Sequence, residues 1–175
     1  MQYKTLIFKS ILGDVHCIFS GEFLIKLYLI KDNHKFKNIE PKIRFMEPVL
    51  NSDSSDKIFS SMYRELELYF SGELREFKQP FKLMKGTPFQ QAVWLTLREI
   101  PFGETRSYKW LAERLGKPFS YRAVGQALKQ NPLLLILPCH RIIASDGSIG
   151  GFACGSEIKR QLLRHESLQS SIHNA

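Results

Sequence analysis

The sequence predicts an α+β protein of two small domains, at residues 1–83 and 84–167, followed by a disordered tail at 168–175. Three features of the 175-residue chain favour this division: strand-like apolar runs open it, capped helical segments fill its second half, and the charge differs between the halves. Residues 1–83 carry 13 basic and 11 acidic side chains, whereas residues 84–175 carry 12 and 6. The basic excess therefore belongs mainly to the second half.

Composition narrows the class of protein. Hydrophobic residues make up 43% and charged residues 24%, which is typical of a folded globular chain. The net charge of +8 favours a polyanionic partner, although basic side chains that only solvate an exposed face would give the same count. No apolar run reaches the roughly 18 residues of a membrane span, and no targeting segment is evident, so we expect a cytoplasmic location, or a nuclear one in a eukaryote. The spacing of Cys17, Cys139 and Cys154 is not typical of a disulfide framework or a metal site.

The first domain begins with three predicted strands. Apolar runs at Tyr3–Phe8, Val15–Phe19 and Phe23–Ile30 are rich in β-branched and aromatic residues. Turn residues at 13–14 and 20–21 separate the runs, which predicts hairpins.

A helix is predicted to follow, after the unassigned residues 31–50. Cap-forming residues at 51–55 precede apolar residues at helical intervals, and Gly72 provides a stop. The apolar residues are Ile58, Met62, Leu66 and Phe70. Residues 79–86 are typical of a linker.

The second domain is predicted to be mostly helical. Thr87-Pro88-Phe89-Gln90 combines an N-cap, a proline at the first helical position and a glutamine at the third, which is a capping box. It starts a helix that ends at Pro101. Ser107 and Ser120 then cap two short helices, at 108–115 and 121–130, whose tight connection predicts a helix-turn-helix.

The second of these short helices has features that suit DNA binding. Arg122 lies in its first turn, and small residues such as Ala123 and Gly125 would allow close approach to a phosphate chain. Two helices that only pack as core elements would give the same pattern, so DNA binding is a hypothesis at this point.

A candidate nucleophile follows the apolar run Leu133–Leu137, which predicts a buried strand leading to Cys139 and His140. An imidazole near a thiol lowers the pKa of the thiol and exposes the nucleophilic thiolate. Neighbouring side chains of a strand point to opposite faces, so a water would have to bridge the two groups. Glu166, at the end of an amphipathic helix over 156–166, is a candidate to orient the imidazole. The alternative is that Cys139 is a small core residue.

Together these motifs resemble the O6-alkylguanine-DNA alkyltransferases, also called methylated-DNA–protein-cysteine methyltransferases. The resemblance covers about residues 84–166. It is carried by Thr87-Pro88-Phe89-Gln90, Ile100-Pro101-Phe102-Gly103-Glu104-Thr105, Ser107-Tyr108, Arg122-Ala123-Val124-Gly125, Asn131-Pro132, Ile136-Leu137-Pro138-Cys139-His140-Arg141 and Leu162-Leu163-Arg164-His165-Glu166. The first domain matches only in size and strand content, and a ribonuclease-H-like fold is expected there by analogy.

The resemblance implies DNA repair by direct reversal. A monomer would bind double-stranded DNA, flip out a guanine alkylated at O6, or a thymine alkylated at O4, and transfer the alkyl group to Cys139 in a single turnover without cofactor or metal. By the same resemblance, His140 and Glu166 form a relay that activates the sulfur through water. Tyr108 helps rotate the nucleotide and donates a hydrogen bond to the base, and Asn131 is the hinge before the reactive segment.

The resemblance also implies residues for DNA contact and for the substrate pocket. Arg122 corresponds to the arginine that fills the space left by the flipped base. The further DNA-contact candidates are Ser120, Ala123, Gly125 and Arg141, and the pocket candidates are Leu134, Phe152, Ala153 and Cys154. Cys154 stands where glycine is common and Leu134 where some relatives have proline, so we expect a narrow pocket that prefers methyl over benzyl groups.

Two other functions use some of the same residues. A lesion-binding or regulatory DNA-binding module would share the basic half and the helix pair, but would give no role to the Cys139–His140 pair. A Cys-His-Glu hydrolase would explain that pair without the basic helices, but it would turn over.

Overall fold

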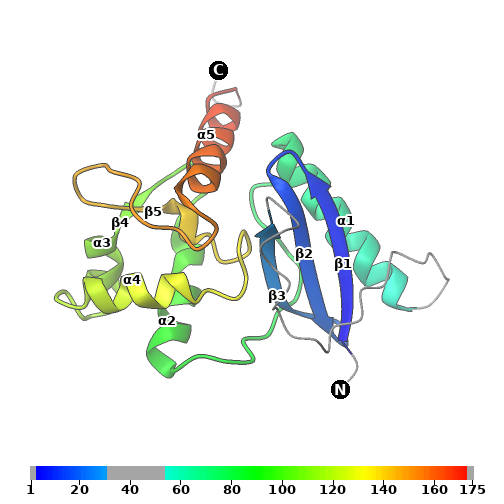
Figure 1. Cartoon of the computed structure of the whole chain (residues 1–175), viewed down its shortest axis with the longest axis horizontal. Coiled ribbons are helices and arrows are strands. Elements are labelled where there is room, and N and C mark those ends of the chain that lie inside the picture. Colours follow the sequence, from blue (N-terminus) through cyan, green and yellow to red (C-terminus); the bar gives the residue numbers. More distant parts are fainter. Residues whose placement is uncertain (1–2, 31–53, 173–175) are drawn as a thin grey trace. The chain divides into compact units, whose positions relative to one another are not determined.

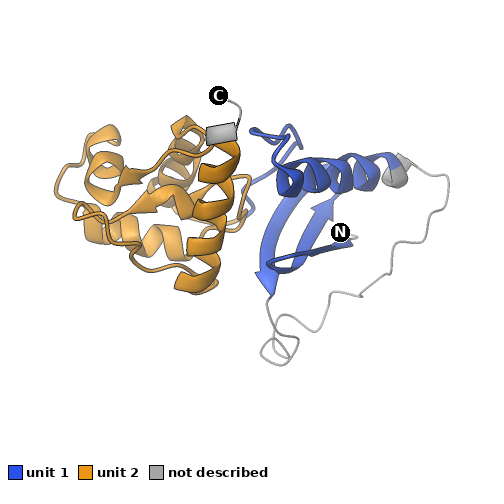
Figure 2. Cartoon of the chain, turned by 90° about the horizontal axis from the view of Figure 1, so that it is seen from above, with its two compact units in different colours: residues 1–84 blue, residues 85–175 orange. Residues whose placement is uncertain are grey.

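The computed structural model describes residues 3–30 and 54–172 (Figure 1). The unassigned residues 31–50 lie outside the described part. The chain divides into two compact units, residues 1–84 and 85–175 (Figure 2). Within the described residues, no helix is long and apolar enough to cross a membrane.

The first unit is built on an antiparallel sheet of three strands in sequential order, β1 (Tyr3–Ser10), β2 (Gly13–Ser20) and β3 (Phe23–Ile30). Two-residue connections at 11–12 and 21–22 join the strands. The predicted position of the first turn is wrong, because Gly13 and Asp14 are the first paired residues of β2, and the second turn lies one residue later than predicted. The register pairs Ser10 with Gly13 and Ser20 with Phe23 at the two turns. The hairpins expected from the sequence are therefore confirmed.

Helix α1 (Ser54–Ser71) supplies the core of this unit. Met62 and Leu66 are fully buried, and the ring of Phe8 on β1 stacks on Phe70 at 5.7 Å. Gly72 ends the helix with φ +86°, a left-handed conformation in which glycine is strongly favoured. The predicted helix and its stop are both observed.

The second unit is mostly helical, with one short parallel strand pair. Its helices are α2 (Pro88–Thr96), α3 (Tyr108–Arg114), α4 (Tyr121–Lys129) and α5 (Ser156–Ile172), and its strands are β4 (Arg106–Ser107) and β5 (Ile142–Ile143). Helices α3 and α4 pack on each other and on α2. The mixed α+β class is confirmed.

Two of the three predicted helix caps form through their side chains. Thr87 and Gln90 make the reciprocal capping box of α2, and the Ser107 hydroxyl accepts a hydrogen bond from the Trp110 amide at 3.0 Å. The third prediction is wrong in its detail. The Ser120 hydroxyl makes no cap bond to α4, because Ser120 has φ −92° and ψ 17° instead of the extended backbone of an N-cap residue, and the hydroxyl donates to the carbonyl of Lys117 at 2.7 Å.

The sequence places two segments wrongly. Leu133–Leu137 is a chain of tight turns instead of a strand, and Leu135 has φ +68°. Backbone hydrogen bonds between residues only two to four positions apart replace the pairing of a strand. Helix α5 continues to Ile172, six residues past the predicted end, so residues 168–172 are helical and not a disordered tail.

The continuation of α5 has a local reason. No glycine or proline interrupts residues 167–172. The Ser170 hydroxyl donates to the Glu166 carbonyl at 2.9 Å and lies against Gly103, where an added Cβ would stand 2.0 Å from the Ser170 oxygen. Gly103 has φ +78°, so both backbone and space require glycine in this turn.

Candidate active site

A single turn of 3₁₀ helix carries the predicted nucleophile, at Cys139–Arg141 between the looped segment and β5. Asn131 fixes the approach to this turn. Its side-chain amide donates to the Leu137 carbonyl at 2.7 Å, and its side-chain oxygen accepts from the Leu133 amide at 3.0 Å. One side chain thus bridges both ends of the loop that leads to Cys139.

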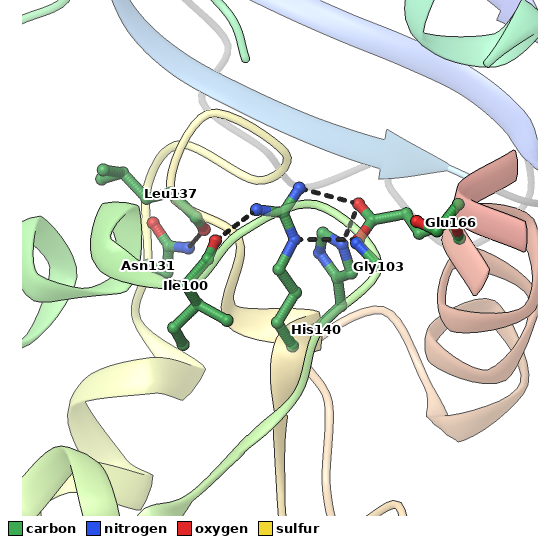
Figure 3. A network of polar contacts seen from close by, with 8 residues as sticks. Ile100, Gly103, Asn131, Leu137, His140 and Glu166 are labelled. Carbon is green, nitrogen blue, oxygen red and sulfur yellow. Dashed lines mark hydrogen bonds and ion pairs between the residues drawn. The ribbon is translucent and has the colours of Figure 1, made fainter. Parts of the chain in front are cut away.

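A buried carboxylate organises the other side of this turn. Glu166, on α5, accepts a hydrogen bond from Nε2 of His140 at 2.8 Å, with both side chains 1% exposed (Figure 3). Arg141 donates two hydrogen bonds to the same carboxylate, from Nε at 2.9 Å and from Nη2 at 3.0 Å. The backbone amide of Gly103 adds a fourth hydrogen bond at 3.1 Å. Arg141 also donates to the Ile100 carbonyl at 2.7 Å, so the network joins α5, the reactive turn and the turn that ends at Gly103.

The charges in this network follow from its chemistry. Burial acts to raise the pKa of Glu166, but His140 and Arg141 outweigh it and hold that pKa well below its usual range. Burial lowers the pKa of His140 despite the nearby carboxylate, which leaves the imidazole neutral at pH 7. A carboxylate only accepts hydrogen bonds, so the single ring proton of His140 sits on Nε2 and Nδ1 keeps a free lone pair.

The thiol of Cys139 behaves differently from the expectation. Burial raises its pKa to about 11, while a hydrogen bond from the Asn131 side chain and the charge of Lys159 pull the value down. The predicted lowering by the neighbouring imidazole is wrong, because His140 is neutral and its proton-bearing nitrogen faces Glu166. The resting sulfur is therefore a protonated thiol.

Lys159 is a site residue that the sequence reasoning missed. This lysine on α5 is fully buried, donates to the Ile142 carbonyl and lies 5.9 Å from the ring centre of Tyr108. Burial lowers its pKa to about 8, and the Cys139 sulfur opposes that shift. A signal was present in the sequence, since residues 159, 162 and 166 share one helical face and a lysine among them breaks an otherwise apolar or paired stripe.

A cavity of about 400 Å³ opens onto the nucleophile. Its lining comes from α3, from α4, from the reactive turn and from the glycine-rich loop before α5. The lining residues include Tyr108, Arg122, Gly125, Cys139, Phe152 and Ala153. The Tyr108 hydroxyl reaches the Gly151 carbonyl at 3.4 Å, and burial raises the pKa of this tyrosine. Cys139 is only 4% exposed yet forms part of the cavity wall.

Comparison with known proteins agrees with this geometry. The family described as "6-O-methylguanine DNA methyltransferase, DNA binding domain" matches residues 88–168. A methylated-DNA–protein-cysteine methyltransferase of Methanosarcina barkeri is 52% identical over 111 residues, which covers 63% of this chain and 69% of the relative. The constitutive protein of that name from Bacillus subtilis is 38% identical over 150 residues, covering 85% and 90%. The chain belongs to the methylated-DNA–protein-cysteine methyltransferase family.

Solved alkyltransferase structures extend the likeness to both units. The crystal structure of Mycobacterium tuberculosis O6-methylguanine methyltransferase gives a TM-score of 0.77 at 34% identity, covering 96% of this chain and 94% of that one. Mycobacterium tuberculosis OGT in complex with DNA gives 0.75 at 35% identity, with coverages of 95% and 93%. The two-domain alkyltransferase fold is thus shared along almost the whole chain.

In this alkyltransferase the structure separates the predicted site residues into two groups. It brings Tyr108, Arg122, Gly125, Cys139, Phe152 and Ala153 to one cavity, with Asn131, His140 and Glu166 supporting the reactive turn. Within the described part of the chain, neither Leu134 nor Cys154 is among the residues that line that cavity, and the preference for methyl over benzyl stays a prediction. Ala123 is exposed on α4 outside the cavity lining.

Arg141 does not fit its predicted role as a DNA contact. Its guanidinium is 7% exposed and is engaged by Glu166 and by the Ile100 carbonyl. A buried carboxylate requires a permanent countercharge nearby, and arginine supplies one in bidentate geometry. Arg141 therefore holds the reactive turn in place from inside the fold.

Proposed function

We propose that this alkyltransferase repairs DNA by direct reversal, moving the alkyl group of O6-alkylguanine, or of O4-alkylthymine, to the sulfur of Cys139 in a single turnover. The observation that carries the proposal is the position of Cys139 on the wall of a cavity that also contains Tyr108 and Arg122. Residues 84–167 bind double-stranded DNA and accept the alkyl group, and residues 1–83 act as a scaffold. The protein acts as a monomer in the cytoplasm, or in the nucleus of a eukaryote.

The damaged base has to leave the helix, because an atom inside the base stack cannot meet the sulfur in line. Arg122 is exposed in the first turn of α4, next to the cavity, and fills the space that the base vacates. Gly125 lines the cavity one turn further on and leaves room for the backbone of the flipped nucleotide.

The reaction then exchanges one bond for another. The sulfur attacks the alkyl carbon, an S–C bond forms, and the bond between that carbon and O6 breaks. The thiol proton passes through a water to Nδ1 of His140, the nitrogen that Glu166 leaves free. Tyr108 donates a hydrogen bond to the departing guanine anion, which finally takes up the proton. A thioether is stable, so the protein is consumed.

The stoichiometry of transfer tests this proposal. Duplex DNA with a radiolabelled methyl group on O6 of guanine is supplied in increasing excess, and label is counted on protein and in solution. The proposal predicts a plateau at one methyl per chain that Cys139→Ser abolishes. Binding of the duplex without transfer would favour a lesion-binding module, and continuing release of methanol would favour a hydrolase.

A further inference from the structure

The connection between α3 and α4 exposes an unusual pair of aromatic side chains. Phe119 is 92% exposed and Tyr121 is 48% exposed, only two residues apart. Scattered apolar residues are ordinary on a protein surface, but neighbouring exposed aromatic rings are typical of an interaction site. Nothing in the proposed transfer reaction uses Phe119.

A second cavity, of about 630 Å³, lies beside these rings. Phe119 and Pro118 line it, and Tyr108 and Tyr121 line both this cavity and the one that contains Cys139. The two cavities therefore adjoin at this pair of tyrosines. A group bound in the second cavity would therefore lie across Tyr108 and Tyr121 from a base in the first.

The charges around the second cavity suit a nucleic acid. Lys109 lines it and Lys117 stands in the same connection as Phe119, while Arg122 follows Tyr121 directly. The one acidic lining residue, Glu113, lies 3.8 Å from the Lys109 ammonium, so these two charges offset each other. The Lys117 ammonium lies 5.8 Å from the ring centre of Phe89, and the basic charge next to Tyr121 is that of Arg122, which lines the Cys139 cavity. Cationic groups around aromatic faces are the combination by which proteins hold unpaired or partly unstacked nucleotides.

We propose that Phe119 and the second cavity hold a nucleobase next to the flipped guanine, stacked on the Phe119 ring. The inference rests on the proposed function, since the flipped base occupies the first cavity. Flipping one nucleotide exposes one face of each of the two neighbouring bases. Arg122, in the vacated space, covers one of these faces, and the Phe119 ring covers the other whatever the sequence. The position beside the Cys139 cavity and next to Arg122 favours DNA as the occupant over a protein partner.

A mutant cycle with altered DNA tests the proposal. Affinity is measured with the full-length chain carrying Cys139→Ser, so that the lesion is bound without being consumed. It is measured at one salt concentration for a duplex with O6-methylguanine, and for two duplexes in which the base on one or the other side of the lesion is replaced by an abasic site. Phe119→Ala weakens binding of the intact duplex by about 5- to 150-fold, the range for losing one stacked base. Phe119→Ala weakens binding much less for one of the two abasic duplexes, because that duplex lacks the base that would stack on Phe119. Phe119→Trp keeps an aromatic ring and retains tight binding of the intact duplex. Leu95→Ala removes an exposed leucine of α2 as a matched control and leaves affinity unchanged.

The other outcomes overturn the proposal in distinct ways. Equal weakening on all three duplexes would mean that Phe119 contacts sugar or phosphate and not a base. Unchanged affinity, or a change only in the oligomeric state seen by sedimentation, would assign the patch to no partner or to a second copy of the chain. If the wild-type protein takes no methyl group from the intact duplex, the proposed function fails, and that readout is separate from the affinities.

Discussion

Nε2 of His140 lies 2.8 Å from Oε1 of Glu166, with both side chains buried in the interior of the second unit. The same carboxylate also pairs with Arg141, so Glu166 both orients the imidazole of the reactive turn and stabilises the fold.

Glu166→Gln should destabilise the protein by about 3–5 kcal/mol, because it leaves the buried guanidinium of Arg141 without a countercharge. Chemical denaturation at pH 7 measures the loss. Glu157→Gln is the matched control on the same helix, since Glu157 pairs with Arg160 at the exposed surface and should change stability little. An equal effect of both substitutions would contradict the account.

The same carboxylate should make the wild-type protein sensitive to acid. The pKa of Glu166 is lower in the folded protein than in the unfolded chain, so its contribution to stability is present above about pH 4.3 and is lost as the pH falls further. Unfolding free energies measured between pH 7 and pH 3 should fall more steeply for the wild type than for Glu166→Gln. Parallel curves would show that the carboxylate is not held in its charged form.

The reactivity of Cys139 toward a small alkylating agent should depend strongly on pH. With a thiol pKa of about 11, only a small fraction is thiolate at neutral pH, and the rate should rise close to tenfold per pH unit before levelling near pH 11. Iodoacetamide labelling of Cys139 followed by mass spectrometry gives this profile. A plateau already reached at pH 8 would contradict the protonated resting thiol.

Lys159 should support the thiolate electrostatically while its ammonium is charged. Lys159→Met is expected to slow iodoacetamide labelling of Cys139 about tenfold at pH 7, the effect of one nearby charge on a thiol pKa. Because the pKa of Lys159 is about 8, the difference from the wild type should shrink at higher pH. Lys85→Met, at an exposed position, is the control. A loss that is independent of pH would indicate only a packing role.

Arg122→Ala should slow methyl transfer from duplex DNA on the order of 10- to 100-fold, since flipping costs a few kcal/mol and the arginine stabilises the flipped state. Transfer from the free base O6-methylguanine needs no flipping and should be much less affected. Single-turnover rates on the two substrates give the comparison, with Arg160→Ala as an exposed control. Equal slowing on both substrates would argue against the role in flipping.

Local signals in the sequence predicted the elements that depend on local chemistry. Apolar runs rich in β-branched and aromatic residues placed the strands of the sheet, and the side chains of Thr87 and Ser107 placed two helix starts. The run Leu133–Leu137 failed because apolar composition reports burial and not backbone conformation. The side-chain amide of Asn131, two residues before the run, stabilises the turns through hydrogen bonds to the Leu133 amide and the Leu137 carbonyl.

The site residues that belong to a sequence motif could be predicted. The orientation and the protonation state of those residues could not, because they depend on burial in the folded protein. The motif correctly grouped Cys139, His140 and Glu166. It did not predict that the Arg141 side chain is buried, where its guanidinium provides the countercharge of the Glu166 carboxylate. The protonated state of Cys139 depends on how completely the fold encloses the sulfur, and no local pattern reports that.

The acceptor itself is the most direct test, because the chain contains three cysteines in different settings. Cys17 is buried in the sheet of the first unit, whereas Cys154 is partly exposed close to Cys139. After reaction with duplex DNA that contains O6-methylguanine, peptide mapping by tandem mass spectrometry should find one methyl group, on Cys139 alone. A methyl group on Cys154 or Cys17, or none on any cysteine, would contradict the account.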